Sequence, residues 1–397
     1  MRRAVPFLVM MSVSAVGEAA LADEPQGASV KVVTASTYDS NVADSSAAGA
    51  ALRGVRPEDW IFQPTVDAEI ALPVGRQQLF VKGSAGYAFY AHNSQLNGQT
   101  IDVQGGLNAH LRDCRLTLAG EWSEERTKLQ DLSVAVNRNI EDTDTIRLEG
   151  DCGRPVGFGP SASIVREWSN NSAQQLVASD YRTITATAGI DYRRSTLGSV
   201  SLFGSYVQTD LPNRTVAIGP VSASDGYRYY GIGAGFDHRL GGRIEGSLRI
   251  AYVTLEPYAH SVPGYSGVDL HADVSVRVSD RLSGRLSVVQ GPLPTIVSNS
   301  TYTLSDSYTV EADYAMTSKV NLKIVASYAT NDYSGVALIP GVDIQHEAIW
   351  TVTCTSRYQV SRRLSVELWA AYGYRNTDVL LYDYNDNRVG LSLIATI

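Results

Sequence analysis

The stretch VDLHADVSVRV, Val268–Val278, decides the fold because apolar and polar residues alternate along its whole length. One face carries apolar side chains only: Val268, Leu270, Ala272, Val274, Val276 and Val278. The other face carries polar or charged side chains: Asp269, His271, Asp273, Ser275 and Arg277. A period of two over about ten residues is typical of a strand in a transmembrane β-barrel, with one face on lipid and one on water.

The same period recurs from one end of the chain to the other. It is clear in ITATAGIDY (Ile184–Tyr192), IEGSLRIAYVT (Ile244–Thr254), LSVELWAAYGY (Leu364–Tyr374) and the final RVGLSLIATI (Arg388–Ile397). We place the first strand at about Ser29–Tyr38. Convincing helical stretches are missing, and after the first 22 residues no apolar run approaches the roughly 20 residues that a spanning helix needs. The fold class is therefore all-β.

Two kinds of connection separate these strands. Eight short turns recur at intervals of roughly 40 residues, at 72–76, 111–115, 154–159, 193–199, 239–243, 278–282, 316–320 and 360–364. The last three share one form, which is apolar, small hydroxyl, polar, basic, apolar. Longer polar loops lie between them, at 39–59, 124–141, 170–180, 210–226, 257–267, 291–300 and 331–345. Short periplasmic turns and long extracellular loops are how outer-membrane barrels are organised.

Eight turns with both termini at the periplasmic side predict a closed, antiparallel, up-and-down transmembrane barrel of about 18 strands, with 16 as the fallback. Closure is required because every backbone N–H and C=O in hydrocarbon must find a partner. The rival is a soluble sandwich or propeller. Such folds use strands of about five residues around a dry core, whereas these strands run to ten or more.

The beginning of the chain is expected to be a targeting segment rather than part of the fold. Arg2 and Arg3 precede a short apolar stretch, Val5–Val16, and Ala20-Leu21-Ala22 resembles a cleavage site. We therefore divide the chain into a secretory signal peptide, 1–22, and a transmembrane β-barrel, 23–397, located in the bacterial outer membrane. The formal net charge of -8 argues against nucleic acid as a partner.

Aromatic side chains gather near the predicted strand ends. Those near the loops are Trp60, Tyr87, Trp122, Trp168, Tyr206, Tyr252, Tyr302, Tyr328, Trp350 and Tyr372. Those near the turns are Tyr192, Phe236, Tyr314 and Tyr358. Two aromatic belts are expected at the two interfaces of a membrane. The alternative is that Tyr simply favours strands, but the uneven placement favours belts.

The polar parity of the strands predicts the residues that line the lumen. They are Lys82, Arg115, Glu121, Arg147, Glu149, Arg249, Asp269, Asp273, Arg277, Arg285, Glu311, Asp313, Lys323, Glu367 and Trp369. Charges of both signs order water in a pore and favour polar solutes over apolar ones. For any single residue the simpler alternative is that it pairs with a neighbour and stabilises the wall. Trp369, with Phe80, Phe203 and Tyr229 on the same parity, could stack on sugar rings or merely pack locally.

Catalytic and metal-binding patterns are missing. The 6 His residues are scattered over different strands and loops, and no His-Glu-x-x-His or Gly-x-Ser-x-Gly occurs. We therefore predict no enzyme activity, no catalytic residue, no metal site and no cofactor. Cys114 begins one strand and Cys152 ends the next, on the same parity, so a Cys114–Cys152 disulfide can form in the oxidising periplasm. Cys354 is left over.

Three stretches resemble a known family. They are TYDSNV (Thr37–Val42), the segment Arg56–Asn97 with its Leu-Pro-Val-Gly-Arg-Gln turn, and the closing YDYNDNRVGLSLIATI (Tyr382–Ile397). They are similar to outer-membrane β-barrel proteins of a porin-like family that is associated with exopolysaccharide-export gene clusters. The resemblance implies a barrel and a role in or near passage of polysaccharide across the outer membrane, and it supplies no catalytic residues to carry over.

These observations together predict an outer-membrane channel or porin for polar solutes, with an accessory role in exopolysaccharide secretion as the finer expectation. The alternative is a structural or surface-interaction barrel with a plugged lumen. Expected partners are outer-membrane lipid, the barrel-assembly machinery and polysaccharide or export-system components. Closure should pair the first strand with the last, so Tyr38 and Asp39 should meet Tyr382 and Asp383 at a rim seam. The acids Asp39, Asp383 and Asp386 there could hold a divalent cation or simply be solvated.

Overall fold

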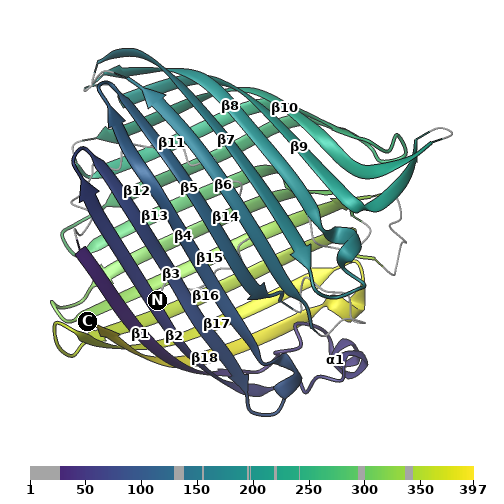
Figure 1. Cartoon of the computed structure of the whole chain (residues 1–397). Coiled ribbons are helices and arrows are strands. Elements are labelled where there is room, and N and C mark those ends of the chain that lie inside the picture. The colour runs from purple at the N-terminus through teal and green to yellow at the C-terminus, as the bar shows by residue number, and fades with distance from the viewer. Residues whose placement is uncertain are drawn as a thin grey trace.

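A computed structural model gives the structure of this chain and describes residues 27–128, 138–153, 156–194, 196, 198–218, 221–240, 242–293, 300–335 and 343–397. Within these residues, 18 strands form one antiparallel sheet that closes on itself (Figure 1). The first nine strands are β1 Gly27–Asp39, β2 Asp59–Val74, β3 Gln77–Tyr90, β4 Gly98–Leu111, β5 Cys114–Arg126, β6 Ile140–Cys152, β7 Gly157–Asn171, β8 Tyr181–Arg194 and β9 Gly198–Ile218. The other nine are β10 Val221–Leu240, β11 Ile244–Pro257, β12 Tyr265–Arg277, β13 Leu282–Leu293, β14 Tyr302–Ala315, β15 Val320–Ser334, β16 His346–Gln359, β17 Leu364–Thr377 and β18 Tyr384–Thr396.

The strand order is that of an up-and-down barrel, since each strand pairs with the next one along the chain and β1 pairs with both β2 and β18. The predicted number of about 18 strands is confirmed, and the fallback of 16 is not needed. Among the described residues, no helix has the length and apolar composition needed to span a membrane.

The short turns owe their shape to local chemistry. In the turn after β12, the Ser279 hydroxyl oxygen accepts the backbone N–H groups of Arg281 at 3.2 Å and Leu282 at 3.1 Å. The Thr317 hydroxyl oxygen accepts that of Val320 at 3.0 Å in the corresponding turn after β14. A hydroxyl that bonds to the backbone two or three residues later favours a turn. The Ser or Thr at the second position of the shared turn sequence therefore closes the turn through its hydroxyl group.

The two faces of the wall differ as the alternation predicts. Along β11, Leu248 and Ile250 are exposed, whereas Ala251 and Val253 on the other parity are buried. The exposed set along the neighbouring strands is also aliphatic or aromatic, and it faces away from the lumen. Most predicted belt residues belong to this exposed set, including Trp60 and Trp350. Trp122, Trp168, Tyr192, Tyr206 and Tyr328 are partly exposed, and Tyr302 is buried in a cluster with Tyr227.

The barrel closes between the first and last strands. Positions Lys31–Asp39 of β1 pair in register with Thr396–Arg388 of β18, and the outward residues Val389, Leu391 and Leu393 are exposed beside them. The final strand is therefore paired on both edges, because β17 lies on its other side. The start of β1 and the end of β18 lie at the same end of the barrel as the short turns.

The first and last strands pair as predicted, but the predicted contact of Tyr38 and Asp39 with Tyr382 and Asp383 is wrong. Asp39 lies opposite Arg388, and the Ser40 hydroxyl next to it donates to Asp386 at 3.3 Å. Asp383 instead accepts the backbone N–H of Thr377 in the β17–β18 connection. The difference arises because β18 extends past the end of β1 and is preceded by a short 3-10 turn, η4 (Leu380–Tyr382), so Tyr382 and Asp383 lie beyond the seam. The Asp39 and Asp386 carboxyls lie beside each other, but Asp383 does not join them, and within the described residues no group of three or more metal ligands occurs.

One of the expected long loops is a strand extension. Residues 210–226 belong largely to β9 and β10, which stay paired as far as Ile218 and Val221, with a register irregularity at Ser224/Asp225. Figure 1 shows this hairpin running past its neighbours at the loop end. The segment therefore continues the wall beyond the neighbouring strand ends instead of forming a separate loop. Residues 129–137, 219–220, 294–299 and 336–342 of the loops lie outside the described residues.

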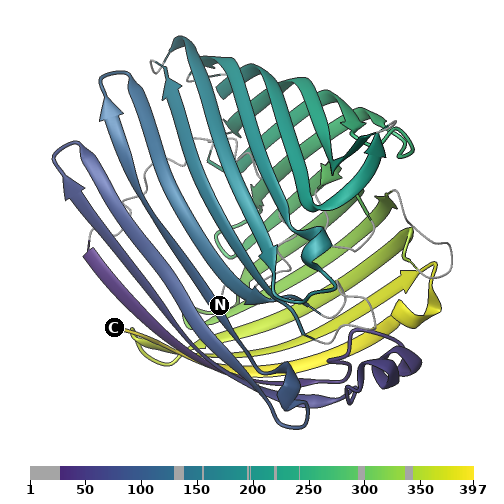
Figure 2. The ribbon, with the colours of Figure 1, turned by 45° about the vertical axis from the view of Figure 1, so that its right-hand side comes forward.

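The first long loop carries a helix, α1 (Ala47–Arg53), at the mouth of the barrel. The Ser46 side chain caps its N-terminus, and Gly54 ends it in the left-handed conformation with φ 63°. Figure 2 shows α1 beside the β17–β18 connection at the loop end. The contact is close, since a Cβ on Gly49 would lie 2.6 Å from the Leu381 carbonyl oxygen.

Candidate functional site in the barrel lumen

The inner face of the wall is the candidate site. All fifteen predicted lumen residues lie at strand positions that alternate with the exposed aliphatic residues, so they face the inside of the barrel. These positions pair in register from strand to strand around the sheet. For example, Arg249 of β11 lies opposite His271 of β12, which lies opposite Val289 of β13. Whether any of them contacts a solute stays a prediction.

Several of these charged residues pair with a neighbour on the adjacent strand. The Arg285 guanidinium lies 2.7 Å from Asp273, and the Lys323 ammonium lies 2.6 Å from Glu311. Arg357 bonds to Glu367 through two nitrogens, at 2.9 and 3.2 Å. The first two pairs are partly exposed and contribute about 0–1 kcal/mol each, whereas the Glu367 side chain is buried. For these residues the simpler role, bracing neighbouring strands, accounts for the geometry.

Other lumen charges are not balanced locally. Lys82 lies 5.9 Å from the centre of the Phe80 ring, and within the described part of the chain it makes no ion pair. Arg115, Arg277 and Glu121 likewise have no ion-pair partner among the described residues. Their charges therefore face the water of the lumen, where they are available to a passing ion.

The most elaborate part of the inner wall lies on β8 to β13. A cavity of about 70 Å³ opens there between Phe203, Tyr229, Arg249 and the neighbouring strands. The Arg249 guanidinium carbon lies 3.8 Å from the centre of the Phe203 ring, a cation–π geometry. The Tyr229 hydroxyl donates to Asp269, whose other oxygen lies 3.0 Å from the His271 ring. The cavity thus combines an aromatic wall, a cation and a hydrogen-bonded acid.

A loop covers this region from the extracellular side. Ala259 and Val262, between β11 and β12, are buried in a cluster with Tyr227 and Leu255. The Tyr302 hydroxyl donates to the Pro263 carbonyl oxygen at 2.8 Å and ties the loop to β14. Sequence reasoning took 257–267 as an ordinary exposed loop and missed this. The one available signal was the apolar Val262-Pro263 pair inside an otherwise polar connection.

The inward aromatic residues lie flat on the wall. A Cβ on the facing glycine would approach each ring to within 2.3–2.7 Å, in the pairs Phe80–Gly106, Phe203–Gly233 and Trp369–Gly390. An aromatic ring that covers a glycine on the next strand is a packing device of β-sheets. The geometry favours local packing over a sugar-stacking role for Trp369, which is buried.

The mouth of the barrel carries buried charge. Arg53 of α1 is 4% exposed and donates to the Ala43 carbonyl oxygen at 2.6 Å. Burial lowers the pKa of Arg53 to about 10, while Asp44 raises it. Burial likewise raises the pKa of the Asp44 carboxyl, against the opposing effect of Arg388. These groups connect the first loop electrostatically to β18.

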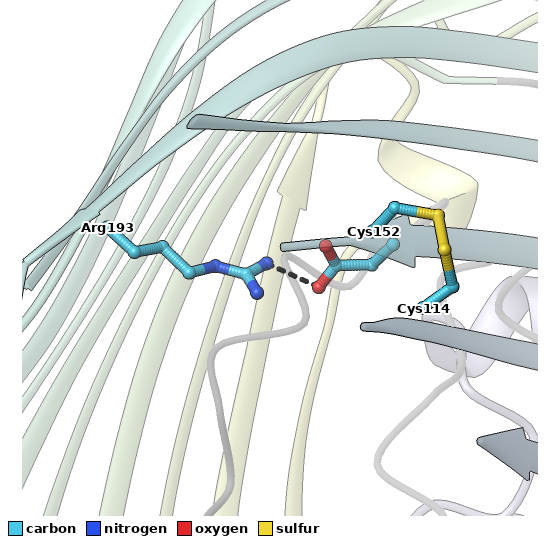
Figure 3. The surroundings of a disulfide bond; sticks show 4 residues. Cys114, Cys152 and Arg193 are labelled. Atoms are coloured by element: carbon cyan, nitrogen blue, oxygen red, sulfur yellow. Dashed lines mark hydrogen bonds and ion pairs between the residues drawn. A yellow bond between two sulfur atoms is a disulfide. The ribbon is translucent and has the colours of Figure 1, made fainter. Parts of the chain in front are cut away.

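The turn side of the wall holds the two cysteines. Cys114 and Cys152 are direct partners in the β5–β6 register, with their sulfur atoms 2.20 Å apart. Figure 3 shows the bond next to the Arg193 side chain, which pairs with Asp151. Cys354 is a free, exposed cysteine on β16.

The chain is similar in shape to several solved structures. OccK2 (OpdF) of Pseudomonas aeruginosa matches with a TM-score of 0.49 and 14% identity, covering 93% of this chain and 97% of that chain. OccAB3 of Acinetobacter baumannii matches with a TM-score of 0.49 and 11% identity, covering 93% and 99%.

The sequence comparisons place the chain in a family. No curated protein matches it. A family model described as "Putative beta-barrel porin 2" matches residues 180–396, which include all of β8 to β18. The matched segment contains Arg249, Phe203 and the loop over them, and it makes up more than half of the chain. The protein is therefore a porin-like outer-membrane β-barrel and belongs to the Putative beta-barrel porin 2 family.

Proposed function

We propose that this protein is a channel that lets small polar solutes cross the outer membrane. The observation that carries the proposal is the closed wall of 18 strands with apolar side chains outside and charges of both signs inside. A wall whose inner charges are partly unpaired favours hydrated, polar solutes over apolar ones. The region around Arg249 and Phe203 is the part of the wall best suited to discriminate among them.

Single-channel recording in planar lipid bilayers tests the proposal. The full mature chain, reconstituted at low concentration, should give discrete steps of current in a simple salt solution. A barrel that is verified as folded by its heat-dependent shift in gel mobility, and that gives no steps at any applied voltage, would contradict it. This gel assay keeps an unfolded sample from being mistaken for a closed pore.

A specific observation favours a second candidate, a barrel whose mouth is plugged and which acts through its surface. Val42, Ala50 and Val55 of the first loop are buried together with Leu96 and Leu176 from two other loops. A second buried cluster joins Ile344, Val379 and Tyr382. If these loops seal the mouth, the wild-type barrel will be silent and a variant with a displaced α1 will conduct.

The finer role, as an accessory to exopolysaccharide secretion, rests on the family resemblance of the sequence alone. We also propose that residues 1–22 are removed on export and that the barrel-assembly machinery inserts the remainder. Deleting the gene and measuring secreted polysaccharide tests the first idea, and an unchanged yield would count against it. The N-terminal sequence of the purified barrel tests the second.

A further inference from the structure

The outer face of the barrel changes character abruptly near the loop ends of β6, β7 and β8. The exposed residues Ile146, Ile164 and Ile184 belong to the lipid-facing apolar band. Toward the loops, the next outward positions are Asp144 on β6, Arg166 on β7 and Arg182 on β8. Arg166 pairs in register with Ile146 and Ile184, and one row nearer the loops Trp168 pairs with Asp144 and Arg182, so charged residues replace the apolar band at its loop edge.

Arg166 and Arg182 lie close together, in two successive rows of the wall. Arg182 is the direct register partner of Trp168, and Arg166 lies two positions before Trp168 on the same face. Diagonal neighbours of this kind are about 7–8 Å apart, within reach of long side chains. The Arg166 guanidinium carbon lies 4.7 Å from the centre of the Trp168 ring. Within the described residues neither arginine has an ion-pair partner.

A groove lies beside these two residues. It has a volume of about 620 Å³ and is lined on the outward face by Trp122, Trp168, Asp144 and Arg182. The Trp122 ring is held in place because its N–H donates to Asp142 at 2.6 Å. Two tryptophans at the edge of an apolar band are typical of a membrane interface, where their rings contact both chains and headgroups.

We propose that Arg166 and Arg182 bind a phosphate group on the headgroup of a lipid in the leaflet at the loop end of the barrel. Guanidinium groups form short, paired, charge-assisted hydrogen bonds to phosphate. An arginine on the lipid face is costly unless its charge reaches a polar partner. A lipid phosphate supplies that partner at the depth where the arginines lie, and the apolar band below the groove contacts the acyl chains of the same molecule.

A neighbouring arginine provides the contrast. Arg228 of β10 faces the same side, and its register partner Gln208 is the partner of Ile184, so it lies in the row of Arg166. Arg228, however, bonds to the Tyr258 hydroxyl, and that hydroxyl donates to Asp210 at 2.9 Å. Its charge is already engaged within the protein. Arg228 is therefore the matched control, because it has the same residue type, face and row as Arg166.

The test uses the full barrel in detergent with EDTA, so that no divalent cation bridges phosphate to Asp144. Native mass spectrometry would follow the binding of diphosphoryl lipid A and of the same lipid without its phosphates. The wild-type barrel should bind the phosphorylated lipid at least about tenfold more tightly. The double variant Arg166→Gln/Arg182→Gln should lose that preference, whereas Arg228→Gln should keep it. Asp144→Asn should tighten binding, because it removes from the groove a negative charge that repels the lipid phosphate.

Three results would overturn the assignment. They are equal binding of the two lipids by the wild-type barrel, an unchanged preference in the double variant, and an equal loss in Arg228→Gln. Displacement of the lipid by inorganic phosphate at comparable concentration would assign the site to free phosphate instead. None of these outcomes depends on whether the lumen conducts, so the inference stands or falls separately from the channel function.

Discussion

The guanidinium group of Arg249 lies over the Phe203 ring at 3.8 Å, on the inner wall of the barrel and beneath a loop that folds inward. Within the described residues this arginine has no ion-pair partner. A cation that is held against an aromatic ring keeps its position while its charge remains available to the lumen. This relationship makes Arg249 the residue at which a change of charge should be felt most by a passing ion.

Replacing Arg249 by Gln should shift the ion preference of the channel toward cations. A unit charge at 4 Å from an ion in water is worth about 1 kcal/mol, so the ratio of anion to cation permeability should fall by up to about fivefold. The reversal potential across a salt gradient measures this ratio. Arg194→Gln removes the same charge at an exposed position outside the lumen and should leave the ratio unchanged. An equal shift in both variants would contradict a local effect.

Gly49 offers a direct test of the mouth. Its Cα approaches the Leu381 carbonyl so closely that any side chain must displace α1 or the β17–β18 connection. Gly49→Val should therefore loosen the loops and raise the mean conductance or the open time of single channels. Ala48→Val adds similar bulk on the exposed side of the same helix and should have no effect. If the two variants behave alike, α1 does not control access.

The stability of the packed first loop at the mouth should depend on pH through Asp44. Burial, and the charge of Asp386 to a lesser extent, raise the pKa of its carboxyl, while Arg388, Arg53 and Lys128 oppose the rise. A carboxyl whose pKa is higher in the packed loop than in the open loop stabilises the packed loop at low pH, where it is protonated. This stabilisation is lost as the pH rises from the pKa in the open loop through the higher pKa in the packed loop. The packed loop should therefore be most stable at acid pH and loosen as the pH increases.

Channel recordings across this range measure the effect as a conductance that grows with pH. Asp44→Asn removes the titration and keeps a residue that tolerates the local φ of 48°. Its conductance should be nearly independent of pH over the same range. A pH profile that is identical in the variant and the wild type would assign the titration to another group.

The architecture could be predicted because its signals are local. Alternation along each strand, as in Val268–Val278, is a property of ten neighbouring residues, and the hydroxyl of Ser279 acts within its own turn. The mouth could not be predicted in the same way. Its structure depends on contacts between loops far apart in sequence, such as Leu176 against Val42, and no periodic pattern encodes such contacts.

The seam between β1 and β18 likewise shows that the contacts of single residues could not be predicted from the sequence. The pairing of the first and last strands follows from closure, but the register depends on how many residues the preceding loop uses. The turn at Leu380–Tyr382 takes Tyr382 and Asp383 out of the predicted contact, so Asp39 meets Arg388 instead. Likewise, parity identifies Arg249 as inward, but only the fold places it over Phe203.

The disulfide should stabilise the turn end of β5 and β6. Cys114 and Cys152 close a loop with a sequence separation of 38, and cross-links of this kind are typically worth about 2–4 kcal/mol. Reduction of the wild-type barrel should lower the temperature at which the folded form is lost on a gel. The Cys114→Ser/Cys152→Ser variant should show the lower temperature with and without reductant. A non-reducing peptide map that recovers both cysteines as free thiols would contradict the bond.

The strongest single contribution to the loop end should come from the pair Arg375–Glu347. Their side chains are 1% and 3% exposed, and Glu347 also accepts hydrogen bonds at 2.6 Å from Asn331 and Tyr333. Removing one partner of a buried ion pair leaves the other charge buried and unbalanced, which costs about 3–5 kcal/mol. Glu347→Ala should lower the free energy of unfolding by about that amount.

The exposed pair Arg56–Glu58 provides the comparison, because its nitrogen–oxygen distance of 2.6 Å is similar but both side chains are about half exposed. Water already solvates these charges, so Glu58→Ala should change the free energy of unfolding far less than Glu347→Ala does. Urea unfolding of both variants in lipid vesicles, followed by tryptophan fluorescence, measures the two values under one condition. Equal costs would mean that water reaches the Arg375–Glu347 pair and that burial does not strengthen it.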